Sequence, residues 1–451
     1  MLTIGLLGLG TVGSGVLEIL TKNHDILKHR TGKILRVKTI LDKDKTKKGM
    51  AHAAGAELTQ NIDDILNDPE IAIVIEAMGG EHPAYEYICK ALEKGKYVVT
   101  SNKEVVAKHK MTFFKLAKKH DTDIFFEATV CGGVPLIRTL KIGLAANQTE
   151  SLYGILNGTT NYILTRIERE QKEFKEVLKQ AQDLGLAEAN PSMDISGLDA
   201  AYKLVILAAV AFKADVCLED IYYEGIETIA LRDIQYAIEL GYRIKLLAIG
   251  CNTTGGSNPA VKSNLEADAK PDVNSRREVN QLGLSVYPVM IPLTHPLASI
   301  HDEFTAVYTT GNMVGETLLT GKGAGALPTA SAVVSDLIDI CFEYGKKVTA
   351  RNLEVNLKPK KVVPLENSFS QFYIRLTAVD TYGVLEKIAG VFGRCHISIS
   401  KLIQKDAMEK KAEIVIVTHS AKEGNMAKAV SGLKMLKDVS EVSTVIRVGL
   451  G

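Results

Sequence analysis

The sequence contains no tryptophan, no C-x-x-C pair and almost no net charge. A formal charge of +1 over 451 residues gives no electrostatic reason to expect nucleic acid or an anionic membrane as a partner. The six cysteines are scattered, which predicts reduced thiols in the cytoplasm and argues against a zinc site. Apolar runs stay shorter than a membrane span, and the apolar N-terminus lacks a basic n-region, so we expect neither a transmembrane helix nor a signal peptide.

A glycine motif is present at the N-terminus, between a predicted strand and a predicted helix. An apolar strand pattern ends in G-x-G-x-x-G, and a helical pattern follows it. Glycines allow the tight turn and the close approach of a pyrophosphate, which the helix N-terminus then holds. The motif in this context predicts a dinucleotide site rather than a simple glycine-rich turn, with contacts at Gly8, Gly10, Thr11, Val12 and Gly13.

A second predicted strand ends at Asp42, where an acid would bond the ribose 2′-hydroxyl and favour NAD. Lys43, Lys45, Lys47 and Lys48 follow it, and these lysines could either neutralise the 2′-phosphate of NADP or form a solvated loop. The sequence therefore leaves the choice between NAD and NADP open.

The pattern of helices and strands divides the chain into regions. Alternating strand and helix patterns up to about residue 140 predict an α/β doubly wound parallel sheet of the Rossmann type. Mixed α+β patterns fill 141–350, where a helix over 328–344 is expected to pack back on the first domain. The polar stretch 252–274 predicts an exposed loop, and the basic, proline-containing segment 351–366 predicts a linker.

The last region, 367–451, follows the order strand, helix, strand, strand, helix, strand. This βαββαβ order predicts a ferredoxin-like module. The module carries no catalytic constellation, but the turn Asp380–Leu385 leads into a helix N-terminus that suits the carboxylate of a small ligand.

Two polar turns lie where the predicted fold would place ligands. Thr100, Ser101 and Lys103 lie at the carboxyl end of a strand over Tyr97–Thr100, where doubly wound sheets bind their ligands. Lys103 fits equally a ligand contact and a surface residue at a helix start. Gly323 precedes the helix over 328–344 in a glycine-rich stretch that is either a second anion-accepting helix start or a hinge.

A third turn follows a predicted strand over Asp123–Ala128. Small residues with free carbonyls lie after Glu127 and could hold a monovalent cation through oxygen ligands. The residues alone favour the alternative, a tight crossover into the helix that begins at Pro135.

A helical pattern over Leu198–Val210 is apolar nearly all round, so we expect it to be buried. Lys203 interrupts it and needs a partner, and Asp199 lies one turn earlier on the same face. With Glu188 and Asp194 just upstream, three carboxylates and one amine converge on the helix start. Alone, this pattern favours a structural ion pair. The alternative is an amino-acid site in which carboxylates bind an ammonium group and the lysine passes a proton.

Taken together, these motifs resemble those of homoserine dehydrogenase. The matching stretches cover nearly the whole chain in order: GLGTVG, EAMGG, GKYVVTSNK, EATVCGGVP, GILNGTTNYIL, LGLAEANPSMDISGLDAAYKL and TGKGAGALPTASAV. The resemblance implies NAD(P)-linked interconversion of L-aspartate 4-semialdehyde and L-homoserine, in the threonine and methionine branch of amino-acid biosynthesis. It also implies that 141–350 is the substrate-binding and dimerisation domain, in a homodimer or homotetramer.

The resemblance implies roles for single residues. Lys203 matches the proton donor and acceptor, with Asp199 beside it. Glu188 matches the residue that binds the substrate amino group, Gly185 lies nearby, and we expect Asp194 to help hold the ammonium.

Other implied contacts lie outside that helix. Lys103 matches a residue that touches cofactor and substrate. The tail resembles an ACT domain, a module that binds end-product amino acids; threonine is the expected ligand, although Tyr382 stands where proline is usual. The sodium site of the family would fall on Glu127, Val130, Gly132 and Val134.

Two other functions fit parts of the sequence. Cys131 could be the nucleophile of a thiol-dependent semialdehyde dehydrogenase, which phosphate-dependent turnover would indicate. The chain could also be an amino-acid sensor that binds nucleotide without turnover, and then homoserine with either cofactor would give no absorbance change at 340 nm.

Overall fold

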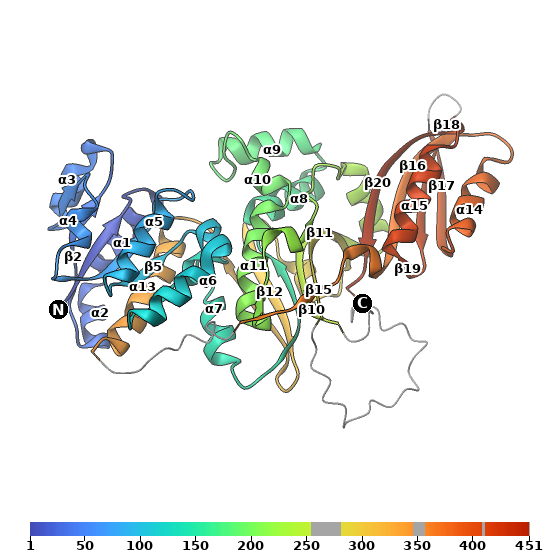
Figure 1. Ribbon diagram of the computed structural model, residues 1–451. Coiled ribbons are helices and arrows are strands. Elements are labelled where there is room, and N and C mark those ends of the chain that lie inside the picture. The colour runs from blue at the N-terminus through green and yellow to red at the C-terminus, as the bar shows by residue number, and fades with distance from the viewer. Residues whose placement is uncertain (254–280, 346–356, 408–410, 451) are drawn as a thin grey trace, which may run out of the picture.

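The computed structural model describes residues 1–253, 281–345, 357–407 and 411–450. In Figure 1 three regions lie in a row: a parallel sheet with its helices near the N-terminus, a central sheet with helices on one side, and a C-terminal module. The predicted fold class, an α/β nucleotide-binding region followed by an α+β region and a βαββαβ module, is confirmed. Within the described residues, no helix combines the length and the apolar character needed to cross a membrane.

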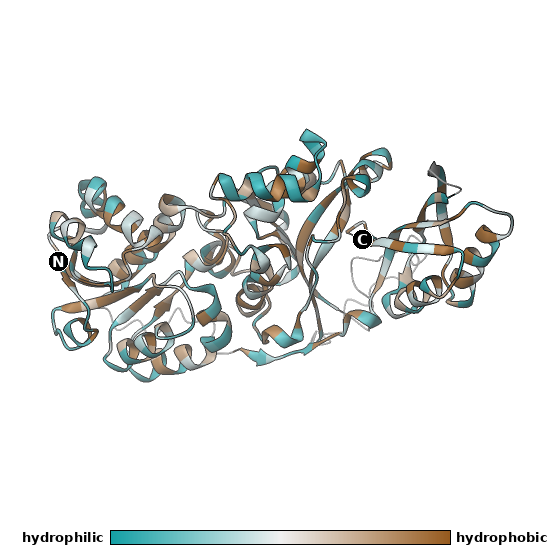
Figure 2. Cartoon of the chain, turned by 90° about the horizontal axis from the view of Figure 1, so that it is seen from above, coloured by the Kyte–Doolittle hydropathy of each residue, from teal (hydrophilic) through white to brown (hydrophobic). Residues whose placement is uncertain are grey.

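The first sheet has six parallel strands in the order β3-β2-β1-β4-β5-β6. The strand order reverses between β1 and β4, and this is the point at which doubly wound sheets bind ligands at their carboxyl edge. The strands are mainly brown in Figure 2, as expected for strands covered on both faces. Their bounds are Leu2–Leu7 (β1), Leu35–Leu41 (β2), Glu57–Thr59 (β3), Ile71–Glu76 (β4), Tyr97–Thr100 (β5) and Ile124–Phe125 (β6).

The predicted strand over 123–128 is shorter than expected, because a 3₁₀ turn begins at Glu127.

Helices cover both faces of this sheet. The helices of this region are Thr11–Lys22 (α1), His24–Thr31 (α2), Lys48–Ala53 (α3), Asp63–Leu66 (α4), Ala84–Glu93 (α5) and Lys103–Lys119 (α6).

One further helix of the first region comes from much later in the chain. α13 (Ala326–Glu343) packs against α1, and its apolar residues belong to the same hydrophobic core as the first sheet. The packing is close, since a Cβ at Gly15 would lie 2.7 Å from the Ala326 carbonyl oxygen. α13 begins before the predicted residue 328, because Pro328 is tolerated in a first turn whose N–H groups have no partner within the helix.

The central sheet is antiparallel and joins the C-terminal module. Its strands run in the order β13-β12-β7-β10-β11. β11 pairs in parallel with β20 (Val439–Val448) of the module, so that one sheet crosses both regions. The bounds are Thr149–Ile155 (β7), Tyr242–Asn252 (β10), Gln281–Pro292 (β11), Phe304–Gly311 (β12) and Gly315–Lys322 (β13).

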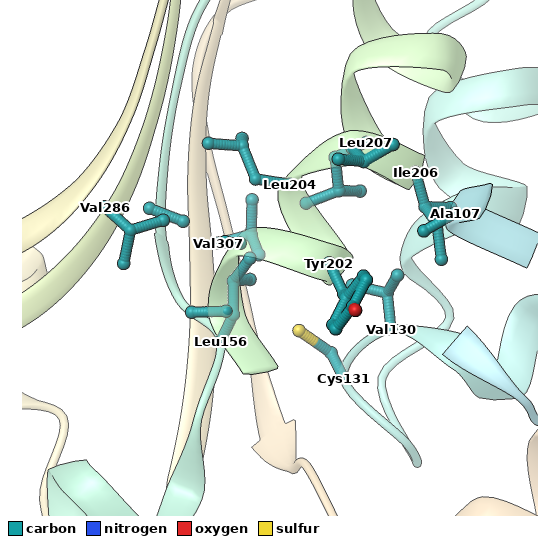
Figure 3. Packing of buried hydrophobic residues seen from close by; sticks show 14 of the residues in the cluster. Ala107, Val130, Cys131, Leu156, Tyr202, Leu204, Ile206, Leu207, Val286 and Val307 are labelled. Atoms are coloured by element: carbon teal, nitrogen blue, oxygen red, sulfur yellow. The ribbon is translucent and has the colours of Figure 1, made fainter. Parts of the chain in front are cut away.

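The predicted buried helix is α11 (Leu198–Phe212), which packs against α6 on one side and β10 and β11 on the other. In Figure 3 its residue Leu204 points toward Val307 of the central sheet, whereas Ile206 lies beside Ala107 of α6. α11 therefore joins the two regions. The other helices here are Leu136–Arg138 (α7), Gly158–Glu170 (α8), Phe174–Asp183 (α9), Ser192–Ile195 (α10) and Leu231–Glu239 (α12).

The C-terminal module has the predicted βαββαβ order, with strands arranged β20-β16-β18-β17. Both helices lie on one face and share a core with the strands. The bounds are Phe369–Val379 (β16), Val384–Arg394 (α14), Ile399–Ala407 (β17), Lys411–Thr418 (β18), Glu423–Lys434 (α15) and Val439–Val448 (β20), with a short β19 (Ala421–Lys422) before α15.

The segment expected to be a linker makes two very short strands where it is described. β14 (Lys358–Pro359) pairs with β8 (Ala214–Asp215), and β15 (Lys361–Val362) pairs with β11. Such short strands leave no periodic pattern in the sequence. Residues 351–356 of the linker and 254–274 of the predicted exposed loop lie outside the described residues.

Candidate active site

The glycine motif forms the turn between β1 and α1. Gly8 has a φ of +93°, and a Cβ there would lie 2.7 Å from the Ala77 carbonyl oxygen. A Cβ at Gly13 would lie 2.1 Å from the Gly8 carbonyl oxygen, whereas one at Gly10 would meet nothing within 4 Å. Among the described residues no side chain caps α1. The first-turn amides, which include those of Thr11 and Val12, are thus left for a phosphate.

Asp42 lies beside this turn, after the end of β2. Its Oδ2 accepts from the Leu9 amide at 2.7 Å and lies 2.9 Å from Lys47 Nζ, and its Oδ1 accepts from the Asp44 amide at 2.9 Å. Burial works to raise the pKa of Asp42, but these bonds outweigh it and the pKa is lowered. Lys43 is exposed. A carboxylate and an ammonium group therefore lie together beside the glycine turn.

The carboxyl ends of β4 and β5 are tied to each other. Thr100 Oγ1 donates to the buried Glu76 carboxylate at 2.6 Å, and the Ser101 amide donates to the Glu76 carbonyl oxygen at 3.2 Å. The Asn102 side chain caps α6. Lys103, the first residue of α6, therefore projects from the same edge of the sheet as the glycine turn.

Lys103 reaches across to the middle region and forms an ion pair with Asp199 Oδ1. Lys203 Nζ donates to Asp199 Oδ2 at 2.7 Å and to the Leu156 carbonyl oxygen at 2.7 Å. The Asp199 side chain is only 2% exposed, while those of Lys103 and Lys203 are 36% and 12% exposed. One buried carboxylate thus binds two amines that come from different regions of the fold.

Asp194 belongs to the same cluster. It lies on α10, and its Oδ1 accepts from Asn157 Nδ2 at 2.7 Å, while the same nitrogen donates to Asp199 Oδ2 at 2.8 Å. Burial and the charge of Asp199 raise the pKa of Asp194. Asp199 itself shows the opposite shift, because Lys203 and Lys103 outweigh its burial and lower its pKa.

Burial works to lower the pKa of Lys103, but the charge of Asp199 outweighs it and the pKa is raised. Glu188 contributes to this effect from an exposed position, so its charge lies close to the cluster. The loop that carries Glu188 is anchored where Thr159 Oγ1 donates to the Leu186 carbonyl oxygen at 2.8 Å. Gly185, at φ +70°, forms the exposed turn at the start of this loop.

The turn predicted as a cation site is packed against the glycine-rich turn before α13. A Cβ at Gly132 would lie 2.5 Å from the Gly323 carbonyl oxygen. The buried Glu127 carboxylate accepts from the Ile137 amide at 2.8 Å and the Arg138 amide at 2.7 Å, at the start of α7. Since Glu127 is directed at this helix, a cation here would depend on backbone carbonyls, of which that of Val134 already accepts from the Leu136 amide.

Cys131, in the same turn, does not have the properties of a nucleophilic thiol. Its side chain is 1% exposed, and Figure 3 shows its sulfur beside Tyr202, below α11. Burial raises the pKa of the thiol to about 11, whereas a nucleophilic cysteine needs a lowered pKa and access to substrate.

Known proteins match both the cofactor region and the middle region. The family model described as homoserine dehydrogenase, NAD binding domain, matches residues 8–127, and the model described as homoserine dehydrogenase matches residues 135–338. Homoserine dehydrogenase of Bacillus subtilis is 38% identical over 447 residues, which cover 99% of this chain and 98% of that protein. The chain belongs to the homoserine dehydrogenase family.

Solved structures of homoserine dehydrogenases agree with this. The crystal structure of the enzyme from Thiobacillus denitrificans has a TM-score of 0.89 at 37% identity and covers 100% of this chain and 99% of its own. A hyperthermophilic archaeal homoserine dehydrogenase, solved in complex with NADPH, has a TM-score of 0.59 at 26% identity, over 76% of this chain and 99% of its own. The family recognised from the sequence motifs is confirmed, and an NAD(P)-dependent oxidoreductase fold carries the cluster around Asp199.

Sequence reasoning missed Asn157, which contacts both carboxylates of the cluster. Asn157 appears there only within the matching stretch GILNGTTNYIL and receives no role. An asparagine at the start of a helix is the usual sign of a cap, and Asn157 indeed caps α8. The second function of its amide depends on tertiary contacts and leaves no local signal.

Proposed function

We propose that this protein interconverts L-homoserine and L-aspartate 4-semialdehyde, in the threonine and methionine branch of amino-acid biosynthesis. The observation that carries the proposal is the cluster in which Asp199 binds Lys203 of α11 and Lys103 from the edge of the cofactor sheet. The cluster combines a proton-transferring group with carboxylates for an ammonium group beside a nucleotide-binding turn. The test is the initial rate of absorbance change at 340 nm with homoserine and NAD or NADP. A sensor without turnover gives no change.

The nicotinamide cofactor supplies the hydride that is exchanged with the substrate carbon. Lys203 gives a proton to the carbonyl oxygen of the semialdehyde as homoserine forms, and takes it back from the hydroxyl in the reverse direction. An ammonium has three N–H donors, and Leu156 and Asp199 each accept one, which leaves the third for the substrate oxygen. Such acid–base help contributes about 10²–10⁴ to the rate.

The substrate ammonium is held by Glu188 and Asp194, with Gly185 in the adjacent turn. Lys103 contacts both substrate and cofactor, because it projects from the cofactor sheet and ends at Asp199. Its raised pKa keeps it cationic, so that it favours a carboxylate or phosphate.

The cofactor would lie along the carboxyl edge of the first sheet, and an archaeal relative solved in complex with NADPH supports a nicotinamide nucleotide as that cofactor. Asp42 suits the 2′-hydroxyl of NAD, and Lys47 and Lys43 suit the 2′-phosphate of NADP. We therefore propose that both cofactors are accepted, which the initial rates with each will test. The other contacts we propose are Gly8, Gly10, Thr11, Val12, Gly13, Thr100, Ser101 and Gly323.

A monovalent cation, Na⁺, would be held by the turn that contains Val130, Gly132 and Val134, beside Glu127. Its role would be to keep this turn in place between α11 and α13, because the turn packs against Gly323. Rates in sodium chloride and in choline chloride of equal ionic strength test this role.

The C-terminal module would act as an ACT domain that binds a regulatory amino acid, threonine, at the turn Asp380–Leu385. The chain would assemble as a homodimer or homotetramer in the cytoplasm, where its six free thiols stay reduced. Inhibition by threonine in the full chain, and its loss in a chain that ends near Pro364, tests the regulatory proposal.

A further inference from the structure

The amide of Asn157 joins two carboxylates that carry the proposed chemistry. We propose that Asn157 is a positioning residue that holds the Asp194 and Asp199 carboxylates in the geometry needed to bind the substrate ammonium and to orient Lys203. This inference rests on the proposed function and adds a residue to that site.

The orientation of the Asn157 amide is fixed by its neighbours. The backbone amide of Thr160 donates to Asn157 Oδ1 at 2.8 Å, and a backbone N–H cannot accept, so this atom must be the oxygen. The nitrogen therefore faces the carboxylates and donates to Asp194 Oδ1 at 2.7 Å and Asp199 Oδ2 at 2.8 Å. Since an amide nitrogen has two hydrogens, each carboxylate receives one.

The arrangement solves an electrostatic problem. Asp194 is partly buried and Asp199 is buried, and two like charges so placed are costly unless donors lie between them. Asp199 has the ammonium groups of Lys203 on its own helix and Lys103 on α6, whereas among the described residues Asn157 is the hydrogen-bond donor to the Asp194 carboxylate. Burial and Asp199 raise the pKa of Asp194, while Asn157, Lys203 and Lys103 lower it.

Loss of the donor would let the pKa of Asp194 rise further, so that Asp194 would be protonated at a higher pH. A protonated Asp194 no longer attracts the substrate ammonium. The consequence is a higher KM for homoserine. The acid limb of the pH profile, where kcat/KM falls as the pH is lowered, also moves to higher pH. Binding of the cofactor at the glycine turn does not depend on this contact.

Asn157 also caps α8, so the test must separate the two roles. Asn157→Ser and Asn157→Asp both keep a side-chain oxygen for the Thr160 amide. Serine is shorter and replaces the amide nitrogen that donates to both carboxylates with a single hydroxyl, without adding charge. Aspartate keeps the size of the residue and places a third carboxylate against the other two.

A matched control lies one turn further along α8. Asn161 is equally buried, but its Nδ2 donates to the Asp302 carbonyl oxygen at 2.9 Å and its Oδ1 accepts from Lys245 at 2.8 Å, away from both carboxylates. Asn161→Ser should lower the melting temperature without moving the acid limb.

The measurement is kcat/KM for homoserine against pH in the full chain, with the KM for cofactor and the melting temperature. We expect Asn157→Ser to lower kcat/KM about ten- to a hundredfold near neutral pH, the loss of a charge-assisted hydrogen bond, and to move the acid limb upward. Asn157→Asp should lower kcat/KM for homoserine further. In both variants the KM for cofactor should stay within about twofold of that of the unmodified chain.

A melting temperature that falls in Asn157→Ser while the acid limb stays in place would overturn the inference and leave Asn157 as a helix cap. Asn157→Asp with the kinetics of the unmodified chain would overturn it as well. If the unmodified chain does not turn over homoserine at all, it is the proposed function that fails, so the two failures are distinguishable.

Discussion

Two buried aspartates, each in the first turn of one of two consecutive helices, have different partners. Asp233 on α12 is fully buried and accepts from Arg375 Nε at 2.7 Å and Nη2 at 3.0 Å, from Tyr373 at 3.0 Å and from Thr444 at 3.0 Å. Asp199 on α11 binds two lysines that keep some exposure. We call the first group, Asp233, Arg375, Tyr373 and Thr444, the junction cluster.

The difference lies in the cation. Arginine stays protonated in proteins, and its guanidinium group binds a carboxylate through two parallel hydrogen bonds. The junction cluster can therefore hold parts of the fold together but cannot transfer a proton. It joins α12 of the middle region to β16 and β20 of the C-terminal module. A lysine can release its proton, and Lys203 has one N–H left for a ligand. An aspartate therefore makes a structural joint at position 233 and, in our proposal, part of a reactive site at position 199.

The largest effect should come from removing the reactive amine. We expect Lys203→Ala to lower kcat about 10²–10⁴-fold, because the proton donor is lost, while the KM for cofactor changes little. Steady-state rates at 340 nm measure this, with Lys172→Ala, which removes a partly exposed ion pair with Glu170, as the control. A kcat within a few-fold of the unmodified chain would contradict the role given to Lys203.

A change in the junction cluster should lower the stability of the fold and leave the activity intact. Asp233→Asn removes the charge that pairs with Arg375 in a buried place, so we expect the free energy of unfolding to fall by about 3–5 kcal/mol. Urea denaturation measures it, and the folded fraction should keep its kcat. Glu239→Gln on the same helix, whose partner Lys405 is exposed, should cost under about 1 kcal/mol. An equal fall in the free energy of unfolding in both variants would contradict the structural role of the junction cluster.

A smaller effect concerns the dependence of stability on pH. The pKa of Asp199 is lowered in the folded chain, so its carboxylate stabilises the fold above its ordinary value of 3.8 and loses this contribution as the pH falls below that value. Asp199→Asn should therefore cost about 1–3 kcal/mol at pH 7 and pH 5, and less at pH 3. A cost that already shrinks between pH 7 and pH 5 would show that the carboxylate titrates higher.

The smallest effect is expected at the buried thiol of Cys131. Cys131→Ala should leave kcat within about twofold, because the thiol is buried and its raised pKa keeps it protonated. Insensitivity of the rate to phosphate and to thiol alkylation gives the same information. A loss as large as that of Lys203→Ala would restore a nucleophilic role for the thiol.

The two aspartates also show how far sequence reasoning reaches. Asp199 and Lys203 were paired in advance, because they are four residues apart on a helix whose apolar pattern is strong. The βαββαβ order and the glycine turn could also be predicted, because each depends on a pattern of residues that are close together in the sequence. Nothing local, in contrast, pairs Asp233 with Arg375, which lies 142 positions away.

Tertiary contacts decide the rest of the site. That Lys103 crosses to Asp199, and that Asn157 lies between two carboxylates, follows from the packing of α6, α8 and α11. The Glu127 carboxylate was predicted beside a cation, and it accepts from two amides at the start of α7. A sequence shows that a buried carboxylate needs partners, but the fold selects them.

The most direct test of this contrast is kcat for homoserine oxidation by Lys203→Arg, with its melting temperature. Arginine keeps the positive charge beside Asp199 and cannot release a proton. We predict a melting temperature near that of the unmodified chain and a kcat lower by about a hundredfold or more. A variant that retains kcat within a few-fold would show that Lys203 acts through its charge alone, and the proton-transfer role would be wrong.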